Sequence, residues 1–354
     1  MLATLAFVNP HRDPGWTYER VAATDPRPLP RASHPIDLGS PLPLDEFHTR
    51  TATTAFQVLV DGVLVHSWYA DGLGPQDLFL GASATKSVLA HLVGAAGMDL
   101  DAPVEAYVPE LAASGYGGVP VRDVARMTSG VDWVEDHRDP EGPATALVGA
   151  FAAGGSSRTL LARVRPRHPP GARFAYCTAD SQVLDWVRER ATGVGFRDAL
   201  GELWRRLGCT DDAMVAVDGD GVALAGGGVA AAAGDWARIG LAQIDPPQID
   251  RAWADISSRP SLPNLAPGRL PAPLSAHVGF GYHWWPLDDA GARVAADGSR
   301  GQFVYVDRPR RTVVVKTSAW PYGDAAHDAH CRDLTYRTLP RIAATVASRE
   351  RVQG

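Results

Sequence analysis

The chain has 354 residues, of which 45% are hydrophobic and 21% are charged, a composition typical of a globular protein with one large domain or two lobes. Its formal net charge of −6 gives no basic face for nucleic acid or for an anionic membrane surface. The cysteines Cys177, Cys209 and Cys331 are too few and too scattered for a disulfide framework or a paired set of metal ligands.

The N-terminal part of the chain predicts an arm followed by a hairpin. Residues 1–16 contain a short apolar run without a preceding Lys or Arg, so we expect no signal peptide and a cytoplasmic protein. Residues 1–50 are rich in Pro, His, Arg and Asp and lack periodicity, which predicts an irregular arm that is partly disordered. Between residues 55 and 69, two runs of β-forming residues are split by Asp61-Gly62, a strong hairpin signal.

The stretch from Leu78 to Met98 holds one formal charge, Lys86, in an otherwise apolar or small-residue run. Its Gly, Ser and Thr residues interrupt it too often for a membrane span, so we expect a buried helix. A buried lysine is costly unless it is paired or neutral. Ser83 precedes Lys86 by one helical turn, which makes an S-x-x-K motif, the arrangement in which a lysine activates a serine nucleophile.

Helices and long loops are predicted from Asp99 to about Leu270, with helices at 121–127, 180–191, 196–207 and 229–239. Strands return at 302–306 and 312–316 as a second hairpin, and the tail from 325 to 347 is predicted to be helical.

This element order predicts an α/β (α+β) fold class. An antiparallel sheet lobe flanked by helices is expected from residues 1–80 and 271–354. A mostly helical lobe is expected from 81–270, beginning with the Lys86 helix. Clefts usually lie between such lobes, so we expect the active site there.

Ser83 and Lys86 are expected at the start of their helix, where several effects favour catalysis. The positive end of the helix dipole and burial both favour a neutral amine that can accept the serine proton. A helix start also directs a backbone N–H at a developing oxyanion. Since the S-x-x-K spacing is common by chance, this interpretation depends on further motifs.

Two later segments could complete the site. Tyr176 follows a Pro-Gly turn and precedes a predicted helix, and a phenol held near an ammonium can relay protons; an ordinary core tyrosine is the alternative. The segment Asp297–Gln302 places Gly298 and Gly301 before a strand, which permits close approach of the backbone to a ligand; a plain loop is equally compatible.

Other features do not support a different chemistry. There is no G-x-S-x-G motif, and Gly226–Gly228 predicts a tight turn into a helix rather than a phosphate loop. His327, His330 and Cys331 are residue types that bind metals and lie close together in the sequence, but they are expected at the surface. We therefore expect no metal and no cofactor. Several aromatic residues fit either a cleft or a core: Tyr116, Trp133, Tyr282, Trp284, Trp285 and Trp320.

Collinear blocks carry a resemblance to a known family. These blocks are Ser83–Lys86, 121–133, 170–176, 224–229, 281–285 and 301–307. With them the chain resembles the serine hydrolases of the penicillin-recognising, class C β-lactamase-like superfamily, and within it the 6-aminohexanoate-dimer (nylon-oligomer) hydrolases and related esterases. The resemblance extends from about residue 55 to 345, which is nearly the whole chain.

The resemblance implies a single domain with a β-lactamase/transpeptidase-like fold. It implies that Ser83 is the acylated nucleophile, that Lys86 is its proton partner and that Tyr176 is the general base and acid. The oxyanion hole would consist of the N–H groups of Ser83 and Ser299. The implied substrate-binding residues are Trp133, Thr178, Gly298, Arg300 and Gly301.

Two departures from the family pattern bear on the substrate. Thr178 stands where many relatives have Asn, and the third motif lacks the Lys-Thr-Gly that binds the antibiotic carboxylate in true β-lactamases. We therefore expect hydrolysis of a small or linear amide or ester through an acyl-enzyme.

The alternatives left open are a β-lactamase or D-peptidase, for which Arg300 is the nearby cationic anchor, and a non-catalytic ligand-binding or sensor module. The expected partner is a small-molecule amide or ester, without nucleic acid or membrane, and a homodimer is left open.

Overall fold

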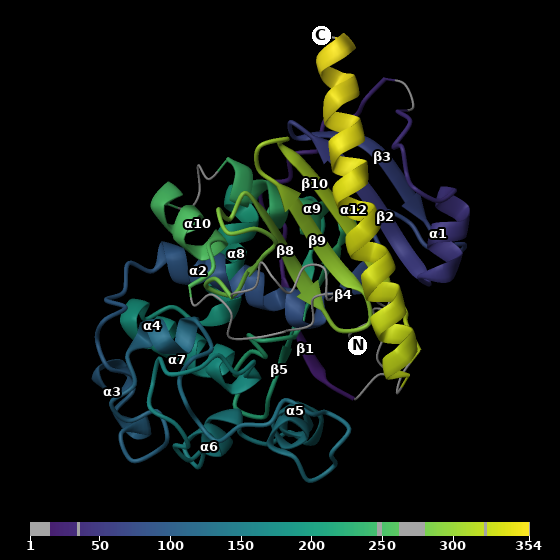
Figure 1. Cartoon of the computed structure of the whole chain (residues 1–354). Coiled ribbons are helices and arrows are strands. Elements are labelled where there is room, and N and C mark those ends of the chain that lie inside the picture. Colours follow the sequence, from purple (N-terminus) through teal and green to yellow (C-terminus); the bar gives the residue numbers. More distant parts are fainter. Residues whose placement is uncertain (1–14, 34–35, 246–249, 262–279, 322–323, 354) are drawn as a thin grey trace.

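The computed structural model describes residues 15–33, 36–245, 250–261, 280–321 and 324–353. In this part of the chain the larger sheet has six antiparallel strands in the order β3-β2-β10-β9-β8-β7. They are β2 (Thr53–Val60), β3 (Val63–Tyr69), β7 (Trp285–Pro286), β8 (Arg293–Gly298), β9 (Gln302–Asp307) and β10 (Thr312–Ser318). Strands from distant parts of the chain therefore pair side by side, β2 against β10 (Figure 1).

Both predicted hairpins are confirmed. The β2–β3 turn is Asp61-Gly62, and both residues have positive φ (50° and 80°), as the right-handed twist of a two-residue hairpin requires. The second hairpin joins β9 to β10.

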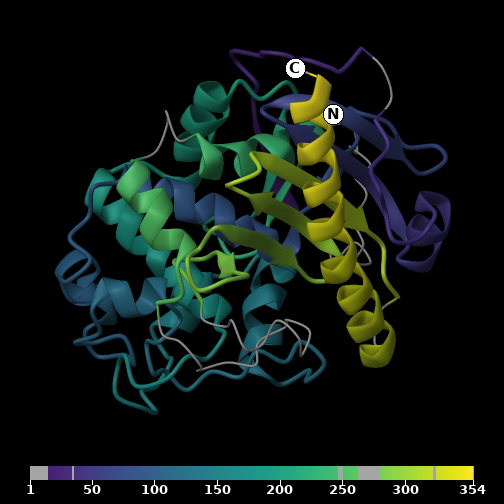
Figure 2. The same cartoon turned by 45° about the horizontal axis from the view of Figure 1, so that its top comes forward.

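Helices cover both faces of this sheet. The long helix α12 (Ala325–Gln353) runs across one face (Figures 1 and 2), and α9 (Ala233–Ile244) packs on the other. Alternate residues of β9 point to opposite layers: Phe303 and Tyr305 pack with the α12 side chains, whereas Val304 packs in the core that includes α9. Since both faces are buried, the central strands are mostly apolar, although they also bury polar side chains such as Gln57 and Lys316.

Four strands form a second antiparallel sheet among the described residues, in the order β1-β5-β6-β4. They are β1 (Thr17–Val21), β4 (Leu78–Leu80), β5 (Ala213–Val217) and β6 (Val229–Ala232). The irregular arm predicted for residues 1–50 is therefore wrong at β1 and at helix α1 (Leu44–Arg50); residues 1–14 of that arm lie outside the described residues. Local propensity does not predict β1 because its stability comes from pairing with β5, whose paired residues lie 192 to 200 positions later in the sequence.

The single helix expected from Leu78 to Met98 is wrong in its first part. Leu78–Leu80 is strand β4, a 3₁₀ turn η1 follows at Ala82–Ala84, and helix α2 spans Thr85–Ala95. The apolar start of the stretch is buried by pairing with β6 rather than by helix packing. Gly81 separates strand from turn, and a Cβ there would lie 2.3 Å from the Trp236 ring.

The helix expected at 229–239 also begins later than predicted. Val229–Ala232 is β6, and α9 begins at Ala233. Alanine favours a helix locally, but pairing with β4 and β5 outweighs that preference. The turn Gly226–Gly228 therefore leads into a strand, not into a helix.

The remaining helices lie mostly away from α12 (Figure 1). They are α3 (Val104–Tyr107), the 3₁₀ turn η2 (Pro109–Leu111), α4 (Val121–Ala125), α5 (Pro143–Ala153), α6 (Ser157–Leu161), α7 (Thr178–Thr192), α8 (Phe196–Leu207) and α10 (Arg251–Ser258). In Figure 1, α3 to α7 are in the lower part of the picture, and α8 and α10 are on the left beside the large sheet. The predictions at 121–127, 180–191 and 196–207 are confirmed to within two residues. The fold class is confirmed, and the lobe boundaries near residues 80 and 270 stay a prediction.

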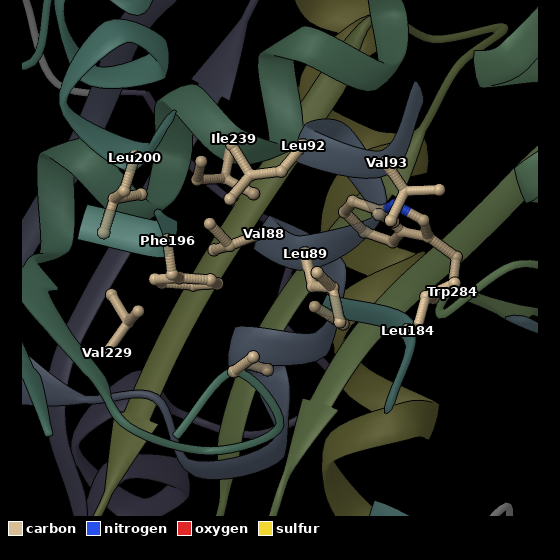
Figure 3. Packing of buried hydrophobic residues seen from close by; sticks show 14 of the residues in the cluster. Val88, Leu89, Leu92, Val93, Leu184, Phe196, Leu200, Val229, Ile239 and Trp284 are labelled. Atoms are coloured by element: carbon tan, nitrogen blue, oxygen red, sulfur yellow. The ribbon is translucent and has the colours of Figure 1, made fainter. Parts of the chain in front are cut away.

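Helix α2 lies at the centre of the main core, where Val88, Leu89 and Leu92 pack among side chains of α7, α8 and α9 (Figure 3). Every residue from Thr85 to Val93 is buried. A helix that is enclosed on all sides has a fixed position, so its first turn holds Lys86 rigidly. In the described segments, no helix combines the length and apolar character needed to span a bilayer.

A buried carboxyl ties two loops to the start of α7. Asp180 accepts hydrogen bonds from the Tyr116 hydroxyl (2.9 Å) and the Ser129 hydroxyl (2.8 Å), and it is fully buried. Burial raises the pKa of Asp180 to about 7, against the hydrogen bonds from Ser129, Tyr116 and Cys177, which lower it.

We expect Asp180→Asn to stabilise the fold at alkaline pH relative to wild type. Between pH 3.8 and about 7 the unfolded chain has lost the Asp180 proton while the folded protein retains it. The free energy of unfolding of the wild type therefore falls through this interval, by an amount on the order of a few kcal/mol, and the fall is complete above pH 7. Asparagine cannot ionise, so the melting temperature of the variant minus that of wild type should increase from pH 5 to pH 9.

The control is Asp71→Asn at an exposed position, whose difference from wild type should not change with pH. A difference for Asp180→Asn that is equal at both pH values would show that Asp180 is not protonated in the fold.

Candidate active site

The side-chain nitrogen of Lys86 reaches acceptors from three separate segments of the described chain. Its Nζ donates to the Gly226 carbonyl at 2.7 Å, the Thr178 hydroxyl at 3.1 Å and the Ser83 hydroxyl at 3.4 Å. Lys86 is only 2% exposed, so these partners replace water. Ser83 is half-buried in η1 and follows Ala82, a non-glycine residue at φ 46°, which marks a strained turn before the candidate nucleophile.

Tyr176 also lies next to Lys86. The Nζ atom is 5.0 Å from the centre of the Tyr176 ring, within the range of a cation–π contact. The ring is half-buried and stacks on Trp285, with centroids 5.7 Å apart and planes 17° apart. The structure thus places Ser83 and Tyr176 each in contact with Lys86, and their catalytic roles stay a prediction.

Glu135 is a further charged residue of this group that the sequence analysis missed. Its carboxylate accepts hydrogen bonds from the Thr178 N–H at 2.8 Å and from the Thr178 hydroxyl. The Trp133 indole N–H donates to it at 2.6 Å, and His137 Nε2 lies 3.2 Å away. An ionised carboxylate only accepts hydrogen bonds, so its partners act as donors. Because these partners come from two segments, Glu135 connects the loop after Trp133 to the start of α7.

Glu135 is ionised despite its burial. Burial raises the pKa of its carboxyl, but the contact with His137, the positive charge of Lys86 and the two bonds from Thr178 outweigh it and lower the pKa to about 2. The site therefore holds an ionised carboxylate that contacts Lys86 through the Thr178 hydroxyl.

The segment Ser299–Gly301 is the turn of the β8–β9 hairpin, in which Gly298 pairs with Gln302. A Cβ on Gly298 would lie 2.2 Å from the Gly81 carbonyl oxygen and 3.1 Å from the Ala84 nitrogen. Only glycine fits there, so the third motif packs directly against the Ser83 turn, consistent with the close backbone approach that an oxyanion donor needs.

A buried ion pair holds this hairpin to α12. The Arg332 guanidinium donates to both oxygens of Asp297, and the Tyr336 hydroxyl donates to Asp297 at 2.8 Å. Both ionised side chains are at most 5% exposed. Because Asp297 immediately precedes Gly298, α12 fixes the position of the third motif.

A cavity of about 1110 Å³ opens over these residues. Ser83, Glu135, Thr178, Ser299 and Arg300 form part of its polar wall. Its apolar wall includes Trp16, Leu80, Val148 and Leu224. Of the predicted substrate-binding residues, Thr178 and Arg300 line the described part of the cavity, whereas Trp133, Gly298 and Gly301 do not.

The remaining aromatic candidates belong to the core. At most 3% of each side chain is exposed, and within the described chain none lines the cavity: Tyr116, Tyr282, Trp284, Trp285 and Trp320. Cys331, predicted at the surface, is instead buried, with its Sγ 3.2 Å from His327 Nε2. The described residues contain no cluster of His, Cys, Asp and Glu side chains that could hold a metal ion.

Two site residues had no clear sequence signal. Glu135 lies just beyond the resembling block that ends at Trp133, and only its place in an otherwise family-like stretch could have indicated it. Gly226 was interpreted as a turn residue, but its carbonyl accepts the shortest hydrogen bond of Lys86. A Cβ there would lie 2.9 Å from Thr178 Cγ2 and 3.3 Å from Lys86 Nζ, so the approach requires glycine.

The chain matches proteins of known family over most of its length. The beta-lactamase family model matches residues 44–336. The 6-aminohexanoate-dimer hydrolase of Paenarthrobacter ureafaciens is 30% identical over 311 residues, which are 80% of this chain and 77% of that protein.

Solved structures agree on the fold. One named as a 6-aminohexanoate-dimer hydrolase from Bacillus anthracis matches with a TM-score of 0.78 and 20% identity, over 95% of this chain and 92% of that chain. A class C beta-lactamase matches with a TM-score of 0.57 and 14% identity, over 84% of this chain and 94% of that chain. The predicted resemblance and the β-lactamase-like fold are confirmed: the chain belongs to the beta-lactamase family and is a serine hydrolase.

Proposed function

We propose that this hydrolase cleaves amide or ester bonds of small or linear substrates through an acyl-enzyme on Ser83. The observation that carries the proposal is the contact between Lys86 Nζ and Ser83 Oγ, 3.4 Å, at the wall of a cavity of about 1110 Å³. A buried lysine beside an accessible serine is the arrangement that activates a hydroxyl nucleophile.

Acylation uses the residues that the structure groups around Lys86. Ser83 Oγ attacks the substrate carbonyl carbon, and its proton passes to the neutral amine of Lys86. The N–H groups of Ser83 and Ser299 are assigned to the oxyanion. As the bond to the leaving group breaks, Tyr176 donates a proton to the leaving nitrogen or oxygen and recovers one from Lys86.

Deacylation reverses these roles. Water attacks the acyl carbon while Tyr176 passes its own proton to the neutral amine of Lys86 and takes one proton from the water. Lys86 then returns a proton to Ser83 Oγ as the acid leaves. In the proposed steps each proton moves between Ser83, Lys86, Tyr176, water and the substrate.

Two features bear on the substrate class. The relative from Paenarthrobacter is named for a linear amide dimer, which favours linear amides and chemically related esters. A β-lactam is the second candidate, because Arg300 lines the cavity beside Ser299 and offers a cation to a carboxylate. A non-catalytic role is disfavoured, since Lys86 is buried and Ser83 and Ser299 line the same cavity.

A fluorophosphonate probe should label the wild type and leave Ser83→Ala unlabelled. The reason is that, at the described cavity wall, the hydroxyls in contact with Lys86 Nζ are those of Ser83 and Thr178. The Thr178 hydroxyl donates to Glu135, so Ser83 is the hydroxyl that Lys86 can activate. Labelled protein is measured by mass spectrometry. Ser67→Ala, at an exposed serine of β3, is the control and should label fully. Equal labelling of Ser83→Ala and wild type would refute the assignment of the nucleophile.

Lys86→Met should lower the acylation rate with a p-nitrophenyl ester by roughly 10²- to 10⁴-fold, the usual contribution of a general base. Methionine preserves most of the buried volume but has no amine. The matched control is Lys316→Met, which removes another fully buried lysine, in this case between β10 and α12. It should leave the burst of p-nitrophenol unchanged. A Lys86→Met protein that acylates at the wild-type rate would contradict the mechanism.

Comparison of three substrates should rank the substrate classes. We expect Ser83-dependent turnover of p-nitrophenyl butyrate and of the linear 6-aminohexanoate dimer, with slower turnover of nitrocefin, because the third motif has no Lys-Thr-Gly. Initial rates at equal substrate concentration provide the ranking. Fastest turnover of nitrocefin, lost in Arg300→Ala, would favour the β-lactam candidate instead.

A further inference from the structure

We propose that Glu135 is a positioning residue that sets the direction of the hydrogen bonds around Lys86. The Glu135 carboxylate accepts a hydrogen bond from the Thr178 hydroxyl, so that Thr178 can only accept a hydrogen bond from Lys86. The lone pair of the neutral Lys86 amine then points at Ser83. The inference rests on the function proposed above and adds a role for a residue outside the Ser83, Lys86 and Tyr176 group.

The first step concerns Thr178. A hydroxyl has one proton and can either donate or accept along a given direction. Thr178 Oγ1 contacts two groups, Glu135 Oε1 and Lys86 Nζ. An ionised carboxylate only accepts, so the Thr178 proton must lie on the Glu135 side. The oxygen of Thr178 then faces Lys86 as an acceptor.

The second step concerns Lys86 in its neutral form, which has two N–H bonds and one lone pair. The Gly226 carbonyl, 2.7 Å away, can only accept, and Thr178 is restricted to accepting by Glu135. Both N–H bonds are used on these two partners. The third direction points toward Ser83 Oγ, 3.4 Å away, to which the protonated lysine donates. In the neutral amine this direction holds the lone pair, so that in the proposed arrangement the Ser83 hydroxyl becomes the donor.

Without a carboxylate at position 135, Thr178 could turn its proton toward the amine. The lone pair of Lys86 would then be occupied by Thr178, and the amine would donate an N–H to Ser83 instead of accepting its proton. An asparagine at the position of Thr178 would present a carbonyl oxygen, which accepts hydrogen bonds whatever its neighbour is. A threonine at this position acts only as an acceptor toward Lys86 when its hydroxyl donates to Glu135.

A purely structural role for Glu135 makes a different prediction. The Thr178 N–H, at the first residue of α7, donates to Glu135 Oε2 at 2.8 Å, so the carboxylate also caps this helix. Capping acts through the backbone N–H and is independent of the Thr178 hydroxyl. Removal of the hydroxyl therefore separates the two roles.

The experiment is a double-mutant cycle on Glu135→Gln and Thr178→Val, with acylation measured as the p-nitrophenol burst. Glutamine keeps an acceptor oxygen but adds an N–H₂ donor that competes for Thr178. We expect Glu135→Gln alone to slow acylation by roughly 10-fold or more, with little change in KM, because proton transfer is affected and substrate binding is not. In the Thr178→Val background the same substitution should change the rate by less than about 2-fold, a strongly non-additive result.

Melting temperatures of the same proteins report on helix capping. Any decrease in melting temperature caused by Glu135→Gln should be equal in the wild-type and Thr178→Val backgrounds. The control is Glu189→Gln, a partly buried carboxylate paired with Arg158 outside the cavity lining, which should leave acylation unchanged.

The outcomes separate this inference from the proposed function. Equal slowing by Glu135→Gln in both backgrounds, or no slowing in either, would overturn the role of Glu135 while Ser83-dependent acylation of the wild type persists. Absence of Ser83-dependent acylation in the wild type would instead refute the proposed function, and the inference with it.

Discussion

The burial of one amine, Lys86, is the constraint on which the site depends. A lysine that is 2% exposed needs polar partners from the protein, and they come from the η1 turn, the start of α7 and the turn before β6. These segments are far apart in sequence, so the site forms only when α2, α7 and the second sheet are packed together. The enclosed position of α2 in the core (Figure 3) keeps the amine from moving away from its partners.

Two glycines allow backbone segments of the site to approach each other closely. Gly226 brings a carbonyl to Lys86, and Gly298 brings the β8–β9 turn against the Ser83 turn, each at a distance that a Cβ would prevent. The hairpin is held in turn by the buried pair of Arg332 and Asp297. Preorganised backbone groups of this kind need not rearrange when charge develops on a substrate.

Membership of the beta-lactamase family and the local geometry answer different questions. The family model and the relative at 30% identity establish a serine hydrolase. The geometry adds a carboxylate, Glu135, that accepts two hydrogen bonds from Thr178. A hydroxyl can donate or accept, so the role of Thr178 beside Lys86 depends on its neighbour Glu135.

The sequence alone determined the elements that depend on near neighbours: the hairpin at Asp61-Gly62, helix 196–207, and the one-turn spacing of Ser83 and Lys86. With the resemblance, it also indicated Tyr176 and the third motif. Only the tertiary structure decided that Leu78–Leu80 and Val229–Ala232 are strands, because their partners are remote and local propensity does not include them. The same holds for Glu135 and Gly226, whose partners Thr178 and Lys86 lie 43 and 140 residues away, since a hydrogen bond across that separation leaves no periodic pattern in the sequence.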